Sequence, residues 1–148
     1  MARIFITGSS DGLGLMAARL LIDQGHDVVL HGRNEGRSRD ALAAAAGAGG
    51  VVSGDLSTIA GPRTVADEVN KLGRFDAVIH NAGVGYREGR VEMEPGVPSV
   101  FAVNVLAPYI LTKAHPAVPG RSICSMRVPC AGDQRRAGGD IGWLGRDR

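Results

Sequence analysis

The sequence has few of the features that would place it outside the ordinary globular proteins. It contains only two cysteines, Cys124 and Cys130, with His115 as the nearest histidine. Two thiols at this spacing make neither a disulfide framework nor a common zinc site, so we expect free thiols and no bound metal. No apolar run approaches the roughly twenty residues of a membrane span, which argues against a membrane partner.

The chain also has little net charge, +2 over 148 residues, which argues against a dedicated nucleic-acid binder. Its distribution is uneven, because residues 114–148 hold six arginines, three aspartates and three prolines and show no helical or strand period. We therefore expect a folded domain over residues 1–113 and a basic, poorly ordered tail over 114–148. The start Met1-Ala2-Arg3 leads straight into an apolar run, which predicts no signal peptide and a cytoplasmic protein.

A glycine-rich turn stands near the start, between a predicted strand and a predicted helix. The strand is expected over residues 3–7, the turn over 7–14 and the helix over 13–24. This order places unpaired N–H groups and the positive end of a helix dipole where a phosphate can bind. Gly8 would permit the turn, Gly12 would admit a pyrophosphate, and Gly14 would allow close packing of helix on strand. A purely structural turn is the alternative.

Strand and helix patterns alternate along the rest of the first 113 residues. We expect the stripe of Leu13, Met16, Ala17, Leu20 and Leu21 to face the sheet. Further strands are predicted at 27–31, 51–53 and 75–80, and further helices at 37–46, 64–71 and 99–113. The segment 85–98 is expected to be irregular. This alternation predicts an α/β fold with a Rossmann-type parallel sheet, helices on both faces, incomplete at its C-terminal side.

The end of the second predicted strand bears on the choice of nucleotide. Dinucleotide folds that take NAD carry an acidic residue near this point to bind the ribose. This chain offers His31 and Arg33 instead, and a guanidinium suits a 2′-phosphate. The sequence therefore favours NADP over NAD, unless Arg33 is only a solvated turn residue.

Four motifs in order resemble those of the short-chain dehydrogenase/reductase family. They are the turn Thr7–Gly14, the dipeptide Asp55-Leu56, the run Asn81-Ala82-Gly83, and Asn104 within a predicted helix. Each has a structural alternative, because Asp55 could cap a helix or form a turn, Asn81 could form a turn and Asn104 could be a buried helix residue. The resemblance covers residues 3 to about 113 and implies cofactor contacts at Gly8, Ser10, Gly12, Leu13, Gly14, Arg33, Asp55, Leu56, Asn81, Ala82 and Gly83.

The same resemblance implies hydride transfer between NADP(H) and a carbonyl or alcohol substrate, with a tyrosine as the acid, a lysine four residues later and an upstream serine. Asn104 would support the proton relay, and Ser125 is the weak candidate for the serine. Tyr109 and Lys113 have the right spacing, but they follow Asn104 on the same predicted helix, so we assign them a structural role. No other tyrosine has a lysine four positions later.

Two functions stay open from the sequence. The first is an NADP-dependent oxidoreductase acting on a small carbonyl or alcohol compound. The second is a non-catalytic dinucleotide-binding module, or an inactive truncated fragment that lacks the Tyr/Lys pair. A sheet that stops early leaves an edge and apolar surface uncovered, so association into a homo-oligomer is a further expectation.

Overall fold

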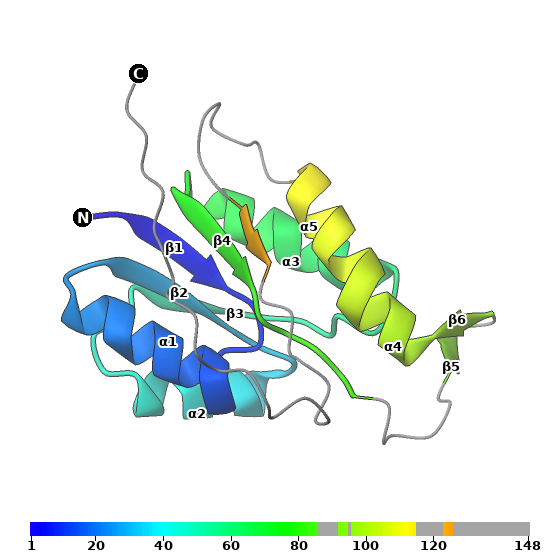
Figure 1. Ribbon diagram of the computed structural model, residues 1–148, viewed down its shortest axis with the longest axis horizontal. Helices are drawn as coiled ribbons and strands as arrows, with labels where there is room; N and C mark the ends of the chain where they lie inside the picture. The colour runs from blue at the N-terminus through cyan, green and yellow to red at the C-terminus, as the bar shows by residue number, and fades with distance from the viewer. Residues whose placement is uncertain (86–91, 95, 115–122, 126–148) are drawn as a thin grey trace, which may run out of the picture.

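The chain alternates strands and helices as the sequence predicts, and the sheet lies between two layers of helices (Figure 1). The computed structural model describes residues 1–85, 92–94, 96–114 and 123–125. The strands are β1 Arg3–Ile6, β2 Asp27–Gly32, β3 Gly50–Ser53, β4 Ala77–His80, β5 Glu92–Glu94, β6 Val97–Pro98 and β7 Ile123–Ser125. The helices are α1 Gly12–Asp23, α2 Glu35–Ala44, α3 Ala60–Lys71, α4 Ser99–Phe101, the π-helical turn η1 Ala102–Leu106 and α5 Ala107–Ala114.

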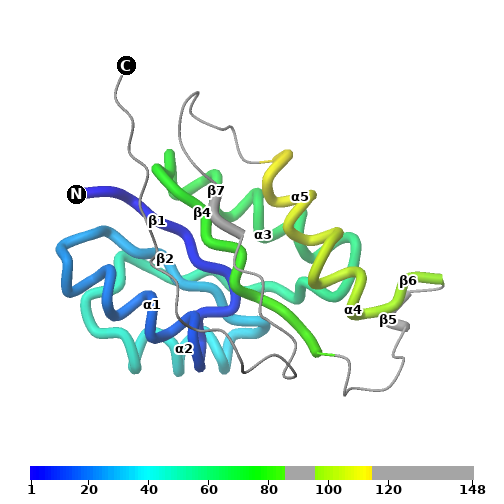
Figure 2. The backbone as a smooth tube through the Cα atoms, viewed as in Figure 1, coloured from blue at the N-terminus to red at the C-terminus, as the bar shows by residue number. Residues whose placement is uncertain are grey.

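Five strands form one parallel sheet in the order β3-β2-β1-β4-β7. In Figure 2 the chain runs outward from β1 through β2 to β3 and then returns to β4 on the other side. Parallel strands need crossover connections, and α1, α2 and α3 supply them. The order reverses between β1 and β4, which opens a crevice at the carboxyl ends of these strands.

Alternate residues of the central strands pack into two separate cores. Ile4 and Ile6 of β1 join a cluster with Ala18 of α1 and Ala41 of α2. Phe5, between them, joins a second cluster that contains residues of α3 and α5. Burial on both faces explains why β1 and β2 are continuous apolar runs. The predicted α/β class with helices on both faces is confirmed.

The face that α1 turns toward the sheet differs from the prediction. Leu13, Met16 and Leu20 are 57%, 64% and 59% exposed, whereas Gly14 and Ala18 are buried. The predicted stripe is therefore wrong for these three residues. Small side chains let the helix axis approach the strands closely, so Gly14 and Ala18 rather than the larger apolar residues occupy the side of α1 that packs on the sheet.

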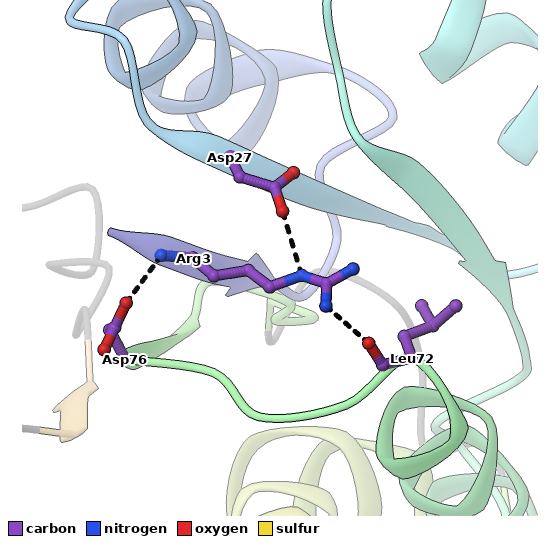
Figure 3. A network of polar contacts seen from close by, with 4 residues as sticks. All are labelled: Arg3, Asp27, Leu72 and Asp76. Atoms are coloured by element: carbon purple, nitrogen blue, oxygen red, sulfur yellow. Dashed lines mark hydrogen bonds and ion pairs between the residues drawn. The ribbon is translucent and has the colours of Figure 1, made fainter. Parts of the chain in front are cut away.

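Arg3 links β1 to β2 and to the segment that leads into β4 (Figure 3). Its Nε lies 2.9 Å from Asp27 Oδ2, and its main-chain N–H donates a 2.8 Å hydrogen bond to Asp76 Oδ2. Its guanidinium also donates to the Leu72 carbonyl and lies 5.0 Å from the Phe75 ring centroid. The start of β1 is thereby fixed against β2 and against the segment that leads into β4.

Two segments depart from the simple prediction between residues 85 and 114. The stretch expected to be irregular contains the antiparallel pair β5–β6, beside residues 86–91 and 95, which are outside the described part. The predicted helix over 99–113 exists, but η1 interrupts its α-helical geometry. Such π-helical turns are uncommon and occur frequently at functional sites.

The predicted tail, 114–148, lies mostly outside the described residues. Ala114 ends α5, and β7 pairs in parallel with β4, with Ser125 beside His80 in the register. The predicted poor order of the tail stays a prediction. Within the described part, no helix is long and apolar enough to cross a membrane.

Candidate functional site: a cleft at the carboxyl ends of the strands

A cleft of about 550 Å³ opens where β1, β2 and β4 end. It gathers ten of the eleven predicted cofactor residues, which come from loops far apart in the sequence. The lining residues are Gly8, Ser10, Asp11, Gly12, Leu13, His31, Arg33, Arg37, Asp55, Leu56, Ser57, Asn81, Ala82, Gly83, Val84, Ser99 and Val103. Among the predicted cofactor residues, Gly14 is not part of this lining.

The two outer glycines of the turn are needed for packing. Gly8 has a φ of 62°, and a Cβ there would lie 2.8 Å from the Cα atom of Ala82. A Cβ on Gly14 would lie 2.4 Å from both Asn81 Nδ2 and the Gly8 carbonyl oxygen. Glycine at these two positions therefore lets the turn and the start of α1 lie this close to the loop after β4.

The amino end of α1 faces the cleft with its main-chain donors uncapped. Asp11 is the N-cap residue, yet among the described residues its side chain makes no capping hydrogen bond, and the first turn holds no acidic residue. Gly12 has a φ of 52° and open space where a Cβ would stand. Unpaired N–H groups at a helix start attract anions. Gly12 leaves room for one to approach.

The loop after β4 is bound to the glycine turn through two polar side chains. Thr7 Oγ1 accepts hydrogen bonds from the N–H groups of Asn81 at 3.0 Å and Ala82 at 3.1 Å. Asn81 Nδ2 donates to the carbonyl oxygens of Gly8 at 2.8 Å and Thr7 at 3.2 Å. Thr7 is 1% exposed, so these bonds are shielded from water. Asn81 therefore fixes the relative position of two cleft walls.

Two arginines supply positive charge at the cleft. Arg33 follows β2 and is exposed, and Arg37 lies in the first turn of α2. Arg37 Nη2 forms a 3.0 Å ion pair with Asp11 Oδ2, which also lines the cleft. Neither Arg37 nor Asp11 was predicted from the sequence. Asn34 caps α2 by accepting the Arg37 N–H, and a capping residue at this point of the sequence is the signal that could have indicated Arg37 in the first helical turn.

Asp55 and His31 form the wall between β2 and β3. Asp55 Oδ1 accepts hydrogen bonds from the main-chain N–H of Ser57 at 2.9 Å and from its hydroxyl at 2.7 Å, which makes a tight turn. His31 lies beneath, with Nδ1 3.0 Å from the Gly8 nitrogen and Nε2 2.9 Å from the Gly54 oxygen. Burial lowers the pKa of His31, while the Gly54 carbonyl and the Asp55 charge act in the opposite direction.

Of the two predicted catalytic residues, Asn104 contacts a residue that lines the cleft. Asn104, in η1, accepts a hydrogen bond from the Val84 N–H and donates one to the Val84 carbonyl, both at 2.9 Å. It does not line the cleft itself but holds Val84, which does. Ser125 ends β7 beside His80, at the same carboxyl edge of the sheet.

Tyr109 and Lys113 lie away from the cleft on α5, and Tyr109 is 60% exposed. Their position is compatible with the structural role that the sequence analysis assigns them. Tyr86, the other tyrosine, lies outside the described residues. Within the described part of the chain, neither a tyrosine nor a lysine lines the cleft.

The sequence of this chain matches a known protein family. The family model described as short chain dehydrogenase matches residues 2–118. The chain belongs to the short-chain dehydrogenase/reductase family. The resemblance stated from the four motifs is therefore confirmed.

Two curated relatives of the short-chain dehydrogenase/reductase family are fungal. An uncharacterized oxidoreductase, AN7799 of Emericella nidulans, is 55% identical over 114 residues, which are 76% of this chain and 45% of the relative. The short-chain dehydrogenase chyC of Penicillium rubens is 50% identical over 112 residues, covering 76% and 43%. The chain thus spans less than half the length of these relatives.

A solved structure extends the comparison to a bound nucleotide. A metagenomic short-chain oxidoreductase in complex with NADP is 34% identical and has a TM-score of 0.63, over 77% of this chain and 54% of that one. This neighbour shares the fold.

Proposed function

We propose that this chain binds NADP in the cleft and forms the cofactor-holding part of an oxidoreductase that transfers hydride between NADP(H) and a carbonyl or alcohol substrate. The proposal rests on the composition of the cleft, in which the uncapped start of α1 and two arginines lie together. Family membership supports the oxidoreductase class. The relatives are named as an oxidoreductase and a short-chain dehydrogenase.

The residues present fit the pyrophosphate and the adenine ring of such a nucleotide. The pyrophosphate would be held by the N–H groups that start α1, where Gly12 leaves open space. Asp55 and Leu56 would contact the adenine ring, and Asn81, Ala82 and Gly83 also line the cleft. When bound, NADP supplies the hydride or accepts it.

The charges at the end of β2 support NADP over NAD. Arg33 and Arg37 line the cleft there, and a guanidinium binds a phosphate monoester through charge-assisted hydrogen bonds. The similar metagenomic oxidoreductase was solved with NADP. Asp11 already pairs with Arg37, which leaves Arg33 as the main candidate for the 2′-phosphate.

For the chemical step we propose Ser125 as a group that polarises the substrate oxygen and Asn104 as a positioning residue. Asn104 would act through Val84, since both of its amide atoms bond to that residue. A dinucleotide-binding module without turnover is the second candidate. It is favoured by the absence of tyrosine and lysine from the cleft lining within the described residues. The division at residue 113, a cytoplasmic location and homo-oligomers stay predictions.

Binding of NADP⁺ and NAD⁺ to the parent chain, measured by calorimetry, tests the proposal. Arg33→Ala should lower the preference for NADP⁺ by about tenfold, since a hydrogen bond to a charged group contributes about 1.5 kcal/mol or more. Arg39→Ala is the matched control, because Arg39 is exposed on α2 and does not line the cleft. No binding of either nucleotide would refute the cofactor assignment. An unchanged preference in Arg33→Ala would refute the role of Arg33.

The two candidate functions differ in turnover. A panel of aldehydes and ketones incubated with NADPH should show oxidation of the nucleotide if the chain is a competent oxidoreductase. Binding without any turnover would favour the non-catalytic module. Tyr109→Phe should change neither result, because Tyr109 lies on α5 away from the cleft.

A further inference from the structure

One buried imidazole joins the two loops that flank the cleft. The His31 side chain is 2% exposed, accepts the Gly8 N–H on Nδ1 at 3.0 Å and lies with Nε2 2.9 Å from the Gly54 oxygen. A carbonyl oxygen only accepts and a main-chain N–H only donates, so the proton must be on Nε2. The two partners therefore select one neutral tautomer of His31.

The main chain of His31 strengthens the same connection. Its N–H donates to Ser9 Oγ at 2.8 Å, and its carbonyl accepts the Ser9 N–H at 3.1 Å. On the other side, the Gly54 N–H donates to the Gly32 carbonyl at 3.0 Å. The glycine turn and the loop after β3 are thus both positioned relative to the end of β2.

Gly8 also packs closely against the loop after β4. A Cβ on Gly8 would meet Ala82 Cα at 2.8 Å, so the turn has close neighbours in this loop as well as in the imidazole. A second proton on His31 would place an N–H group against the Gly8 N–H, and the two donors would repel. The turn would then have to shift between two occupied walls.

We propose that His31 is a positioning residue of the dinucleotide cleft, and that its neutral form holds the glycine turn and the Asp55 loop at the spacing the cofactor needs. This inference rests on the proposed NADP function. It predicts that protonation of His31 and binding of the nucleotide oppose each other.

The groups around the His31 ring determine the pH range in which protonation and nucleotide binding oppose each other. On the β1 side the Phe5 ring centroid lies 6.3 Å from that of His31, with the two rings nearly perpendicular. The loop after β3 presents Asp55, and the cleft side carries Asp11, Arg33 and Arg37. Burial is the largest influence and lowers the pKa of His31 from its ordinary 6.5. The neutral form of His31 therefore predominates at pH 6.5 and above.

His31→Asn tests the proposal because Asn keeps an oxygen near the position of Nδ1 and does not titrate. His80→Asn is the matched control, since His80 is also buried, has a pKa lowered by burial and does not line the cleft. The affinity of the 148-residue chain for NADP⁺ is measured for all three proteins between about pH 7.5 and 5.0. The 2′-phosphate titrates near pH 6. This ligand effect cancels in the ratio of affinities between proteins.

At pH values where NMR shows His31 to be protonated, the parent chain and His80→Asn should lose affinity relative to His31→Asn by about threefold or more. A constant ratio, or a gain of affinity by the parent, would overturn the inference. A second measurement needs no variant. NMR titration of the parent should show that NADP⁺ lowers the pKa of His31, and an unchanged or raised value would contradict us. Failure of the parent to bind NADP⁺ near pH 7.5 would instead refute the proposed function.

Discussion

Gly14→Ala should destabilise the chain without introducing any polar or charged group. The added Cβ would lie 2.4 Å from Asn81 Nδ2 and 2.4 Å from the Gly8 carbonyl oxygen. Neither atom can withdraw easily, because Asn81 is hydrogen bonded to Thr7 and Gly8, and the Gly8 oxygen is part of the main chain. The substitution must therefore push α1 away from the sheet.

The magnitude follows from two opposing contributions. Overpacking of a filled site costs about 1–3 kcal/mol, and contact with main-chain atoms places this case at the upper end. Alanine regains about 1 kcal/mol over glycine within a helix. The net loss is about 2 kcal/mol, which lowers the melting temperature of a chain of this size by about 4–8 °C.

Chemical denaturation and thermal melting would measure this loss directly. Gly50→Ala is the matched control, since Gly50 has no heavy atom within 4 Å of the added Cβ and no positive φ. The control should be neutral or slightly stabilising, because alanine restricts the unfolded chain. Equal stability of Gly14→Ala and Gly50→Ala would show that α1 is not held at contact distance by Gly14.

Three further predictions concern stability. Val65→Ala should lower the free energy of unfolding, measured by denaturation, by about 2 kcal/mol, because Val65 is fully buried between α3 and the sheet. Val105 is half exposed, so Val105→Ala should change this free energy by less than about 0.5 kcal/mol. Equal losses in the two variants would contradict this prediction. Arg3→Gln should lower the free energy of unfolding by about 1 kcal/mol, because it removes a partly exposed ion pair and a cation–π contact. An unchanged free energy of unfolding would show that these contacts do not stabilise the fold. Burial lowers the pKa values of His31 and His80, so as the pH falls the unfolded chain binds protons at these residues before the folded chain does. The stability that they contribute should therefore be greatest above pH 6.5 and decline below it. Replacing both histidines with Asn should flatten this dependence of stability on pH.

The sequence predicted the sheet well because its main signal is burial on both faces. The central strands are short apolar runs bounded by turns, and Phe5 and Val28 are almost completely buried. Helix α3 was also predicted, and its inward-facing Val65 and Val69 are 0% and 1% exposed. In these elements the local pattern and the tertiary packing demand the same residues.

The helix α1 shows where this agreement ends. Periodicity identified a helix but assigned the wrong face, because large apolar residues occur on both sides of it. Close approach to the sheet requires Gly14 and Ala18, and no count of apolar residues reports how near two backbones lie. Leu13 lines the cleft, although periodicity directed it to the sheet.

The candidate site was predictable where it is built from main chain. Gly8, Gly12 and Asn81 act through backbone conformation or main-chain hydrogen bonds, which leave fixed residue types at fixed spacings. Side chains that meet only after folding left weaker signals. His31 and Arg37 depend on partners more than twenty residues away, Gly8 and Asp11, which a local pattern does not reveal.

The two ends of the sheet should respond independently to mutation. Arg3 and its partners hold the amino ends of the strands, far from the cleft, so Arg3→Gln should lower stability and leave NADP⁺ affinity unchanged. Gly12 occupies the cleft with open space around it, so Gly12→Ala costs only the strain of a left-handed residue, about 1 kcal/mol, while its methyl group blocks the phosphate. Sites with no shared partners add in free energy, so the double variant should show both losses and no coupling. Coupling larger than about 0.5 kcal/mol would mean that strain at the amino ends reaches the glycine turn through β1.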